Sequence, residues 1–307
     1  MFEKILNEIK NFDTIIIHRH TNPDGDALGS QIGLKNIITE NFPEKTVYVV
    51  GDGSKRYGFM EGSEMDVIDD SVYGDALAIV LDTSSAALIS DDRYKTAKKT
   101  ARLDHHIFFE EICEIEVTDT SYESCCGLIT EFAIESGLKL SRLAAKSLYT
   151  GMVTDSGRFR YDSTNANTFR LASHLMKAEF DTNEIYNELY ADDFSFIRLR
   201  AQFVLKIKFT ENNVAYIYTT RDELDSYDAD TFTISRAMVG TMGDIKGVNV
   251  WVNFTETENG VLAELRSNKY NINAIAVKYG GGGHLKASGA TLKSREEAMQ
   301  MLKDLNE

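Results

Sequence analysis

The chain has 307 residues, of which 43% are hydrophobic and 26% charged, and its formal net charge at pH 7 is −15. This length favours two domains, and the composition is typical of a globular protein. No apolar run reaches the roughly 18 residues that span a bilayer, and the acidic balance argues against charge-driven binding of long DNA or RNA. We therefore expect a cytoplasmic protein whose cysteines, Cys113, Cys125 and Cys126, are reduced and structural.

The first chemically informative stretch follows a short apolar strand. A helix over residues 2–11 precedes this strand, which is predicted over residues 14–18, and a helix from about residue 26 to 39 comes after it. His20, Asp24 and Asp26 then lie on a loop at the carboxyl end of a strand, where ligands gather in open α/β sheets. One imidazole and two carboxylates suit Mn²⁺, Mg²⁺, Fe²⁺ or Zn²⁺. The alternative is a polar turn in which Asp26 caps the helix, and the loop by itself does not decide between the two.

Two later strands end in the same kind of residue. After a strand over residues 46–50, the strand over 76–81 ends at Asp82, and the strand that begins at Ala101 ends at Asp104-His105-His106. Each group could instead cap a helix or face solvent. Because parallel strands point their carboxyl ends to one edge, His20, Asp24, Asp26, Asp82 and His105 should converge there. Asp155 follows a predicted helix over 141–154 and is a further candidate, with a simple Asp-Ser-Gly turn as its alternative.

The remaining pattern completes an α/β protein with two domains. The predicted N-terminal domain, residues 1–190, is a doubly wound parallel sheet with helices on both faces. Its later helices are expected over 124–136, 166–178 and 182–190. A helical linker over 191–209 leads to a smaller mixed α+β domain over 210–307. The elements predicted there are strands over 214–220, 248–254 and 261–266, helices over 233–245 and 272–279, and a last helix whose capping box is Ser294 with Glu297.

The second domain contains a basic, glycine-rich region. Residues 265–295 hold six Lys or Arg and no Asp or Glu, within an otherwise acidic chain. Four consecutive glycines, Gly280 to Gly283, precede His284, and such a run lets backbone N–H groups approach an anion closely. A mobile hinge is the alternative. With Arg266, Lys286 and Ser288 nearby, phosphate binding is favoured.

The motifs together resemble the DHH phosphoesterase superfamily. His20-x-x-x-Asp24-x-Asp26, Asp82, Asp104-His105-His106 and Asp155 are similar to its four motifs, in order. Arg266-Ser267, the glycine run with His284, and Ala287-Ser288-Gly289 resemble its DHH-associated C-terminal domain. The length and layout are most similar to the bacterial nanoRNase and pAp-phosphatase branch. The resemblance implies an enzyme that converts very short oligonucleotides to mononucleotides and pAp (3′-phosphoadenosine 5′-phosphate) to AMP and phosphate.

The resemblance also implies a role for each motif residue. The protein would bind two divalent ions, most simply Mn²⁺, with Mg²⁺ or Co²⁺ as alternatives. The ligands of one ion would be His20, Asp24 and Asp82, and those of the other would be Asp26, Asp82, His105 and Asp155. The catalytic residues would be Asp82, His106 and Asp104. His106 would face the scissile phosphate, and Asp104 would support the histidines. Substrate contacts would come from Arg266, Ser267, Gly281, Gly282, Gly283, His284 and Ser288.

Other functions on the same fold remain open. The expected partners are short oligonucleotides, dinucleotides and pAp, with no long nucleic acid and no membrane, and the chain is expected to be a monomer or homodimer. One alternative is a phosphodiesterase specific for cyclic or linear dinucleotides. An alternative of another class is a catalytically silent nucleotide sensor, although no motif ligand is missing. Family II pyrophosphatases share the N-terminal motifs but lack the Gly-Gly-Gly-His run.

Overall fold

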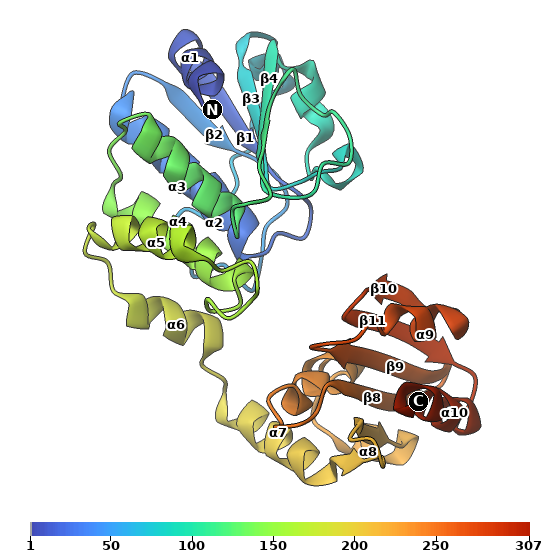
Figure 1. Cartoon of the computed structure of the whole chain (residues 1–307). Coiled ribbons are helices and arrows are strands. Elements are labelled where there is room, and N and C mark those ends of the chain that lie inside the picture. The colour runs from blue at the N-terminus through green and yellow to red at the C-terminus, as the bar shows by residue number, and fades with distance from the viewer. Residues whose placement is uncertain (1) are drawn as a thin grey trace. The chain divides into compact units, whose positions relative to one another are not determined.

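The computed structural model describes residues 2–307. The chain forms two compact units, one ending at Tyr190 and the other comprising Ala191–Glu307, coloured blue to yellow-green and yellow to red in Figure 1. We describe each unit by itself. None of the helices in residues 2–307 combines the length and apolar character that a membrane span requires.

The first unit is built on a five-stranded sheet with the order β2-β1-β3-β4-β5. All four strand pairs are parallel, which confirms the predicted sheet. Its strands are β1 (Thr14–His18), β2 (Thr46–Val49), β3 (Leu77–Leu81), β4 (Lys99–Asp104) and β5 (Ile115–Thr118). Every residue of β3 is buried, as expected for a strand covered on both faces.

Helical segments cover both faces of this sheet. The α-helices are α1 (Glu3–Asn11), α2 (Gly25–Asn41), α3 (Cys125–Glu135), α4 (Arg142–Asp155), α5 (Ala166–Met176) and α6 (Thr182–Tyr190). Strand residues such as Ile17 and Ile79 pack with these helices in the main core. On the opposite face, Ile16 and Val80 pack against segments that contain the 3₁₀ helices η1 (Asp70–Asp75) and η3 (Asp92–Thr96).

Helix caps fix where the site-bearing helices begin. Ser124 and Ser141 cap α3 and α4 by accepting backbone N–H groups through their hydroxyl oxygens. The cap of α2 differs from the alternative we considered. Asp24, not Asp26, accepts the N–H groups of Asp26 and Ala27, each at 3.0 Å. Asp26 is therefore free of the cap role, and it lies inside the first turn of α2 with an exposed fraction of 1%.

The second unit contains a mixed six-stranded sheet with the order β10-β11-β9-β8-β7-β6. Only β7 and β8 pair in parallel. One face packs on α9 and α10, and the other packs on α7 through Phe203. The elements are α7 (Phe194–Lys206), β6 (Lys208–Phe209), β7 (Ala215–Thr219), α8 (Arg221–Ser226), β8 (Val250–Thr257), β9 (Gly260–Ser267), α9 (Asn273–Lys278), β10 (Gly282–His284), β11 (Ala287–Leu292) and α10 (Arg295–Asn306).

Two local predictions in this unit were wrong in detail. Residues 233–245 are not one α-helix but a π-helical turn, η4 (Thr233–Ala237), and a 3₁₀ turn, η5 (Met238–Met242). The amide of Asn253 donates to the carbonyls of Ile234 and Ser235 at 2.7 and 2.8 Å, which gives these carbonyls a partner outside the helix. The predicted capping box of α10 is only half formed, because Ser294 accepts from Glu297 N–H while the Glu297 carboxylate accepts from Lys293 N–H.

Candidate metal centre

The carboxyl ends of three adjacent parallel strands bring the predicted residues together. His20 follows β1, Asp82 follows β3, and His105 follows β4. Asp82 lies between the two imidazoles: its Oδ2 is 3.5 Å from Nε2 of His20, and its Oδ1 is 3.5 Å from Nε2 of His105. One carboxylate thus presents a different oxygen to each histidine, which is the arrangement that a ligand shared by two ions requires.

Helices α2 and α4 complete the cluster with carboxylates. Nε2 of His105 is 3.7 Å from Oδ2 of Asp26 and 3.6 Å from Oδ2 of Asp155. Nε2 of His20 is 3.9 Å from Oδ1 of Asp24. Within residues 2–307, three sets have potential ligand atoms within 4.8 Å of one another: His20, Asp24 and Asp82; Asp26, His105 and Asp155; and Asp82, His105 and His106. The first two sets fall within the two groups that the sequence predicted.

Local backbone geometry orients the two most buried carboxylates. Asp26 accepts the N–H groups of Cys125 and Cys126 at 2.7 and 2.9 Å, so that the N-terminus of α3 fixes its position. Burial and the neighbouring carboxylates raise the pKa of Asp26 well above its usual value. Asp82 has φ +56°, an uncommon left-handed conformation for a residue other than glycine. Within residues 2–307 its buried Oδ1 has no hydrogen-bond partner. An orphaned carboxylate oxygen between two imidazoles fits a divalent cation.

The close approach of α2 and α4 depends on Gly151. A Cβ atom at this position would lie 2.2 Å from Cys126 Sγ and 3.0 Å from Oδ1 of Asp26. No side chain fits in that space. Glycine at this point of α4 lets the helix pass beside Asp26 and carry Asp155 to the same cluster.

The charges of the cluster shift the pKa values of its members. Burial opposes the charged form of His20, but the hydrogen bond and charge of Asp82 outweigh it and raise the pKa of His20 to about 9. In the same way, burial is outweighed by Asp82 and then Asp26, which raise the pKa of His105 to about 10. Burial raises the pKa of Asp155 to about 6. When no cation is bound, protons on the imidazoles therefore offset part of the negative charge of the carboxylates.

His106 and Asp104 form a separate pair at the same edge. Nδ1 of His106 is 2.8 Å from Oδ1 of Asp104, and the His106 N–H donates to the same oxygen at 3.2 Å. Asp104 is fully buried, whereas the His106 side chain is 46% exposed. Asp104 therefore orients His106, since both hydrogen bonds of its carboxylate go to this residue. His18 lies apart from the cluster, with Nδ1 3.1 Å from the carbonyl of Asp91.

In the second unit, the glycine-rich segment is partly a strand. Gly282–His284 forms the edge strand β10, paired with β11. Gly281 and Gly282 line a hollow of about 560 Å³ together with Phe232, Arg236 and Glu264. Arg236 donates to Glu264 at 2.9 Å, and its guanidinium also lies over the Phe232 ring. The sequence analysis missed Arg236, because it lies on η4 and comes to this hollow where it is tied to Glu264 of β9, and no local motif marks it.

Two predicted substrate contacts have internal roles in this structure. Ser267 donates to the carbonyl of Asn249 at 2.9 Å and accepts two backbone N–H groups. Ser288 donates to the carbonyl of His284 at 2.7 Å and accepts from Asn273. Both serines are buried, at 6% and 3% exposure. The Ser267 hydroxyl holds the turn that follows β9, directly after Arg266, and the Ser288 hydroxyl holds the end of β10 at His284. His284 itself is exposed.

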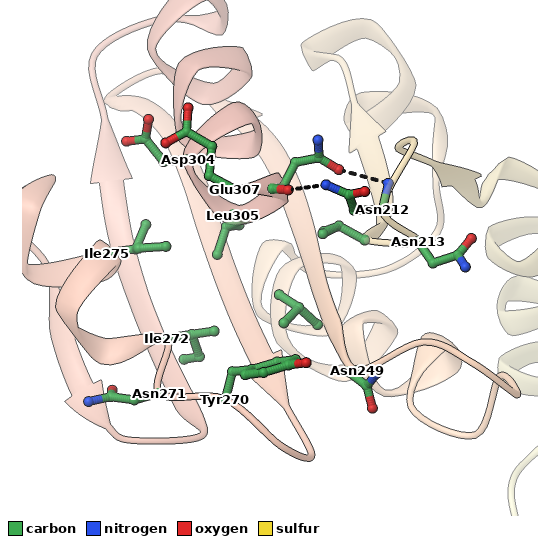
Figure 2. Close-up of a pocket in the computed structure, with 13 residues that line it drawn as sticks. Asn212, Asn213, Asn249, Tyr270, Asn271, Ile272, Ile275, Asp304, Leu305 and Glu307 are labelled. Atoms are coloured by element: carbon green, nitrogen blue, oxygen red, sulfur yellow. Dashed lines mark hydrogen bonds between the residues drawn. The ribbon is translucent and has the colours of Figure 1, made fainter.

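A second cavity in this unit, of about 440 Å³, includes none of the predicted site residues in its lining. Figure 2 shows the side chains of Asn213 and Asn271 extending outward on opposite sides rather than toward each other. Asn212 is tied to Asn306 by two hydrogen bonds, at 3.1 and 2.6 Å. The lining of this cavity contains no Lys or Arg, so the cavity does not suit a phosphate.

Comparison with known proteins identifies the class. The DHH family N-terminal domain matches residues 14–152 and the DHHA1 domain matches residues 213–307. The chain belongs to the DHH family, a family of metal-dependent phosphoesterases, and the predicted resemblance is confirmed.

Individual relatives are similar to this chain over nearly its full length. The chain is 35% identical to the bifunctional oligoribonuclease and PAP phosphatase NrnA of Bacillus subtilis, over 99% of this chain and 97% of that protein. It is 39% identical to the probable bifunctional oligoribonuclease and PAP phosphatase NrnA of Streptococcus mutans, over 99% and 98%. An exopolyphosphatase-related protein from Bacteroides fragilis has a similar crystal structure, with a TM-score of 0.84, 27% identity and coverage of 99% and 95%.

Proposed function

We propose that this chain is a two-metal phosphoesterase that cleaves very short oligonucleotides and dinucleotides to mononucleotides and converts pAp to AMP and phosphate. The observation that carries the proposal is the position of Asp82, with one oxygen toward His20 and the other toward His105, each at 3.5 Å. The activities for which the relatives from Bacillus subtilis and Streptococcus mutans are named supply the substrate class.

The ligand sets proposed for the two ions are His20, Asp24 and Asp82, and Asp26, Asp82, His105 and Asp155. Oxygen and imidazole donors suit Mn²⁺, which we propose as the natural metal, with Mg²⁺ and Co²⁺ as substitutes. Bound in such a pair, divalent ions lower the pKa of a water molecule and neutralise phosphoryl oxygens. We also propose a cytoplasmic location and a monomeric or homodimeric state. All three cysteines are free thiols.

His106 is proposed to act on the phosphate. Its hydrogen bond to Asp104 raises the pKa of His106, which favours the protonated form of the ring. The ring is partly exposed beside Asp82, with Nδ1 3.7 Å from Oδ1 of Asp82. From this position a protonated imidazole can orient the phosphate and give a proton to the departing 3′ oxygen.

The second unit is proposed to bind another phosphate of the substrate. Arg266, His284 and the backbone of Gly281, Gly282 and Gly283 are the contacting groups, and Arg236 joins them as a cation that lines the same hollow as Gly281. Ser267 and Ser288 contribute by holding the loops. Glu264 ties both Arg236 and Arg266, at 2.9 and 3.2 Å, and so keeps the guanidinium groups in place.

His284→Ala tests this binding role. We expect KM for pAp to rise about 10–100-fold with little change in kcat, since a charge-assisted hydrogen bond to phosphate is worth about 1.5–3 kcal/mol. His174→Ala, on α5, is the matched control and should leave both constants unchanged. Steady-state kinetics with bound metal measured in parallel would refute the role if KM and kcat of His284→Ala equal those of the control.

Metal binding should release protons. His20 and His105, with pKa values of about 9 and 10, are protonated at pH 7.5 when no cation is bound. A ligand imidazole must be neutral, so binding expels at least about two protons and weakens as the pH falls. Calorimetric titration of chelator-treated protein with Mn²⁺, in buffers of different ionisation enthalpy, measures this number. A heat independent of buffer would contradict the ligand assignment.

The proposed function predicts a strong preference for short substrates. A 5′-phosphorylated trinucleotide and a 25-nucleotide RNA are incubated with the protein in Mn²⁺, with and without excess chelator. We expect the trinucleotide to yield mononucleotides and the long RNA to persist, because a net charge of −15 opposes binding of a polyanion. Equal rates on both RNAs, or cleavage that survives the chelator, would contradict the proposal.

A further inference from the structure

The loop that carries His20 and Asp24 has an unusual backbone. Asn22, at its centre, has φ +50°, a left-handed conformation that persists where the surroundings impose it. Thr21 N–H donates to the carbonyl of Leu88 at 2.7 Å, and Asn22 N–H donates to Oδ2 of Asp52 at 2.7 Å. The loop is therefore held by two segments far from it in sequence.

The buried guanidinium group of Arg19 anchors Asp52. Arg19, with no exposed surface, donates from Nη1 to Oδ1 of Asp52 at 3.0 Å and to the carbonyl of His20 at 2.9 Å. Its Nη2 donates to the carbonyl of Asp52, and its Nε donates to Gln31 at 3.0 Å. A buried guanidinium requires such partners, so the pair of Arg19 and Asp52 fixes the strand end and the loop together.

Ser90 joins the third segment to this pair. Its hydroxyl donates to Oδ1 of Asp52 at 2.5 Å and accepts the Asp52 N–H at 2.8 Å. Its own N–H donates to the carbonyl of Arg19 at 3.0 Å. Asp52 thus connects the loop after β2, the loop around Ser90 and the turn at Asn22. None of these contacts involves a side chain of the proposed metal ligands.

We propose that Asp52 is a positioning residue for metal binding, which acts by holding the left-handed turn at Asn22 that directs His20 and Asp24 toward Asp82. This inference rests on the metal centre of the proposed function. Residues that orient metal ligands change metal affinity by about 10–100-fold when they are replaced. Loss of the Asp52 charge should therefore weaken binding at the set formed by His20, Asp24 and Asp82.

The test is a Mn²⁺ titration of the full-length, chelator-treated protein, followed by calorimetry and by the electron paramagnetic resonance signal of free Mn²⁺. Asp52→Asn is compared with Asp66→Asn, a matched control. Asp66 is also partly exposed and also accepts from a cation, Lys35, at 3.0 Å and from a backbone N–H, that of Val49, at 2.8 Å. Their exposed side-chain fractions are 36% and 34%, but Asp66 does not contact the loop.

We expect Asp52→Asn to weaken the affinity for one Mn²⁺ by about tenfold or more, with activity recovered at high Mn²⁺, while Asp66→Asn binds as the wild type does. Ser90→Ala should weaken binding less, in the same direction, and carries the test if Asp52→Asn does not fold. Equal affinity in the wild type, Asp52→Asn and Ser90→Ala would overturn the positioning role alone, and so would an equal loss in Asp66→Asn. A wild-type protein that binds no Mn²⁺ would overturn the proposed function as well.

Discussion

Replacing Asp82 with alanine is expected to lower kcat for hydrolysis of the linear dinucleotide pApA by at least about 10³-fold. Asp82 is the residue whose two oxygens face two different histidines, His20 and His105, each at 3.5 Å. Its loss removes a ligand from both proposed ions at once, so added metal should not restore activity. The measurement is the single-turnover rate at saturating Mn²⁺, with metal content determined on the same sample.

Two further variants separate chemistry from folding. Asp82→Asn keeps the shape of the side chain, and asparagine tolerates the left-handed backbone observed at this position. It should lose activity almost as fully as the alanine variant while remaining folded. Asp92→Ala removes an exposed aspartate from η3 and should behave as the wild type. Activity of Asp82→Ala within tenfold of this control would show that the two-metal assignment is wrong.

Gly151→Ala is expected to damage both stability and activity. The added methyl group would overlap Cys126 Sγ at 2.2 Å and press on Oδ1 of Asp26 at 3.0 Å. Overpacking of a buried helix contact costs about 1–3 kcal/mol of unfolding free energy. Because the displaced atoms include a proposed ligand, kcat should also fall about 100-fold, as expected for a displacement of about 1 Å.

The matched substitution is Gly74→Ala. A Cβ atom at Gly74 would have no atom within 4 Å, so the variant should unfold at the wild-type urea concentration and retain full activity. Urea unfolding and pApA hydrolysis are measured on both proteins. If Gly151→Ala were as stable and as active as Gly74→Ala, the close packing of α2 and α4 around Asp26 would have no functional importance.

The first sheet and its edge were predictable because each signal was local. Short buried runs mark β1, β3 and β4, and the parallel arrangement of their strands follows from the alternation with helices. Once those strands are neighbours, their carboxyl ends must bring His20, Asp82 and His105 together. In the structure, Nε2 of His20 and Nε2 of His105 each lie 3.5 Å from a carboxylate oxygen of Asp82, as expected from the sequence.

Features that depend on distant partners were not predictable. Asp52 lies in a Gly-Asp-Gly sequence with no distinguishing pattern, and its role emerges only from contacts with Arg19 and with Ser90, 33 and 38 positions away. Arg236 lies on η4 and comes to the hollow beside the glycine-rich segment through packing against β9, where it is tied to Glu264. The serines at 267 and 288 matched the motif, but their hydroxyls are used within the fold, which only the three-dimensional structure reveals.

The central claim is tested most directly by incubating the protein with pApA, pAp and inorganic pyrophosphate in parallel, in Mn²⁺ and in excess chelator, and separating the products by chromatography. The account predicts AMP from pApA and AMP with phosphate from pAp, both abolished by the chelator, and little turnover of pyrophosphate. Phosphate released from pyrophosphate alone, or no turnover of pApA and pAp in Mn²⁺, would contradict it.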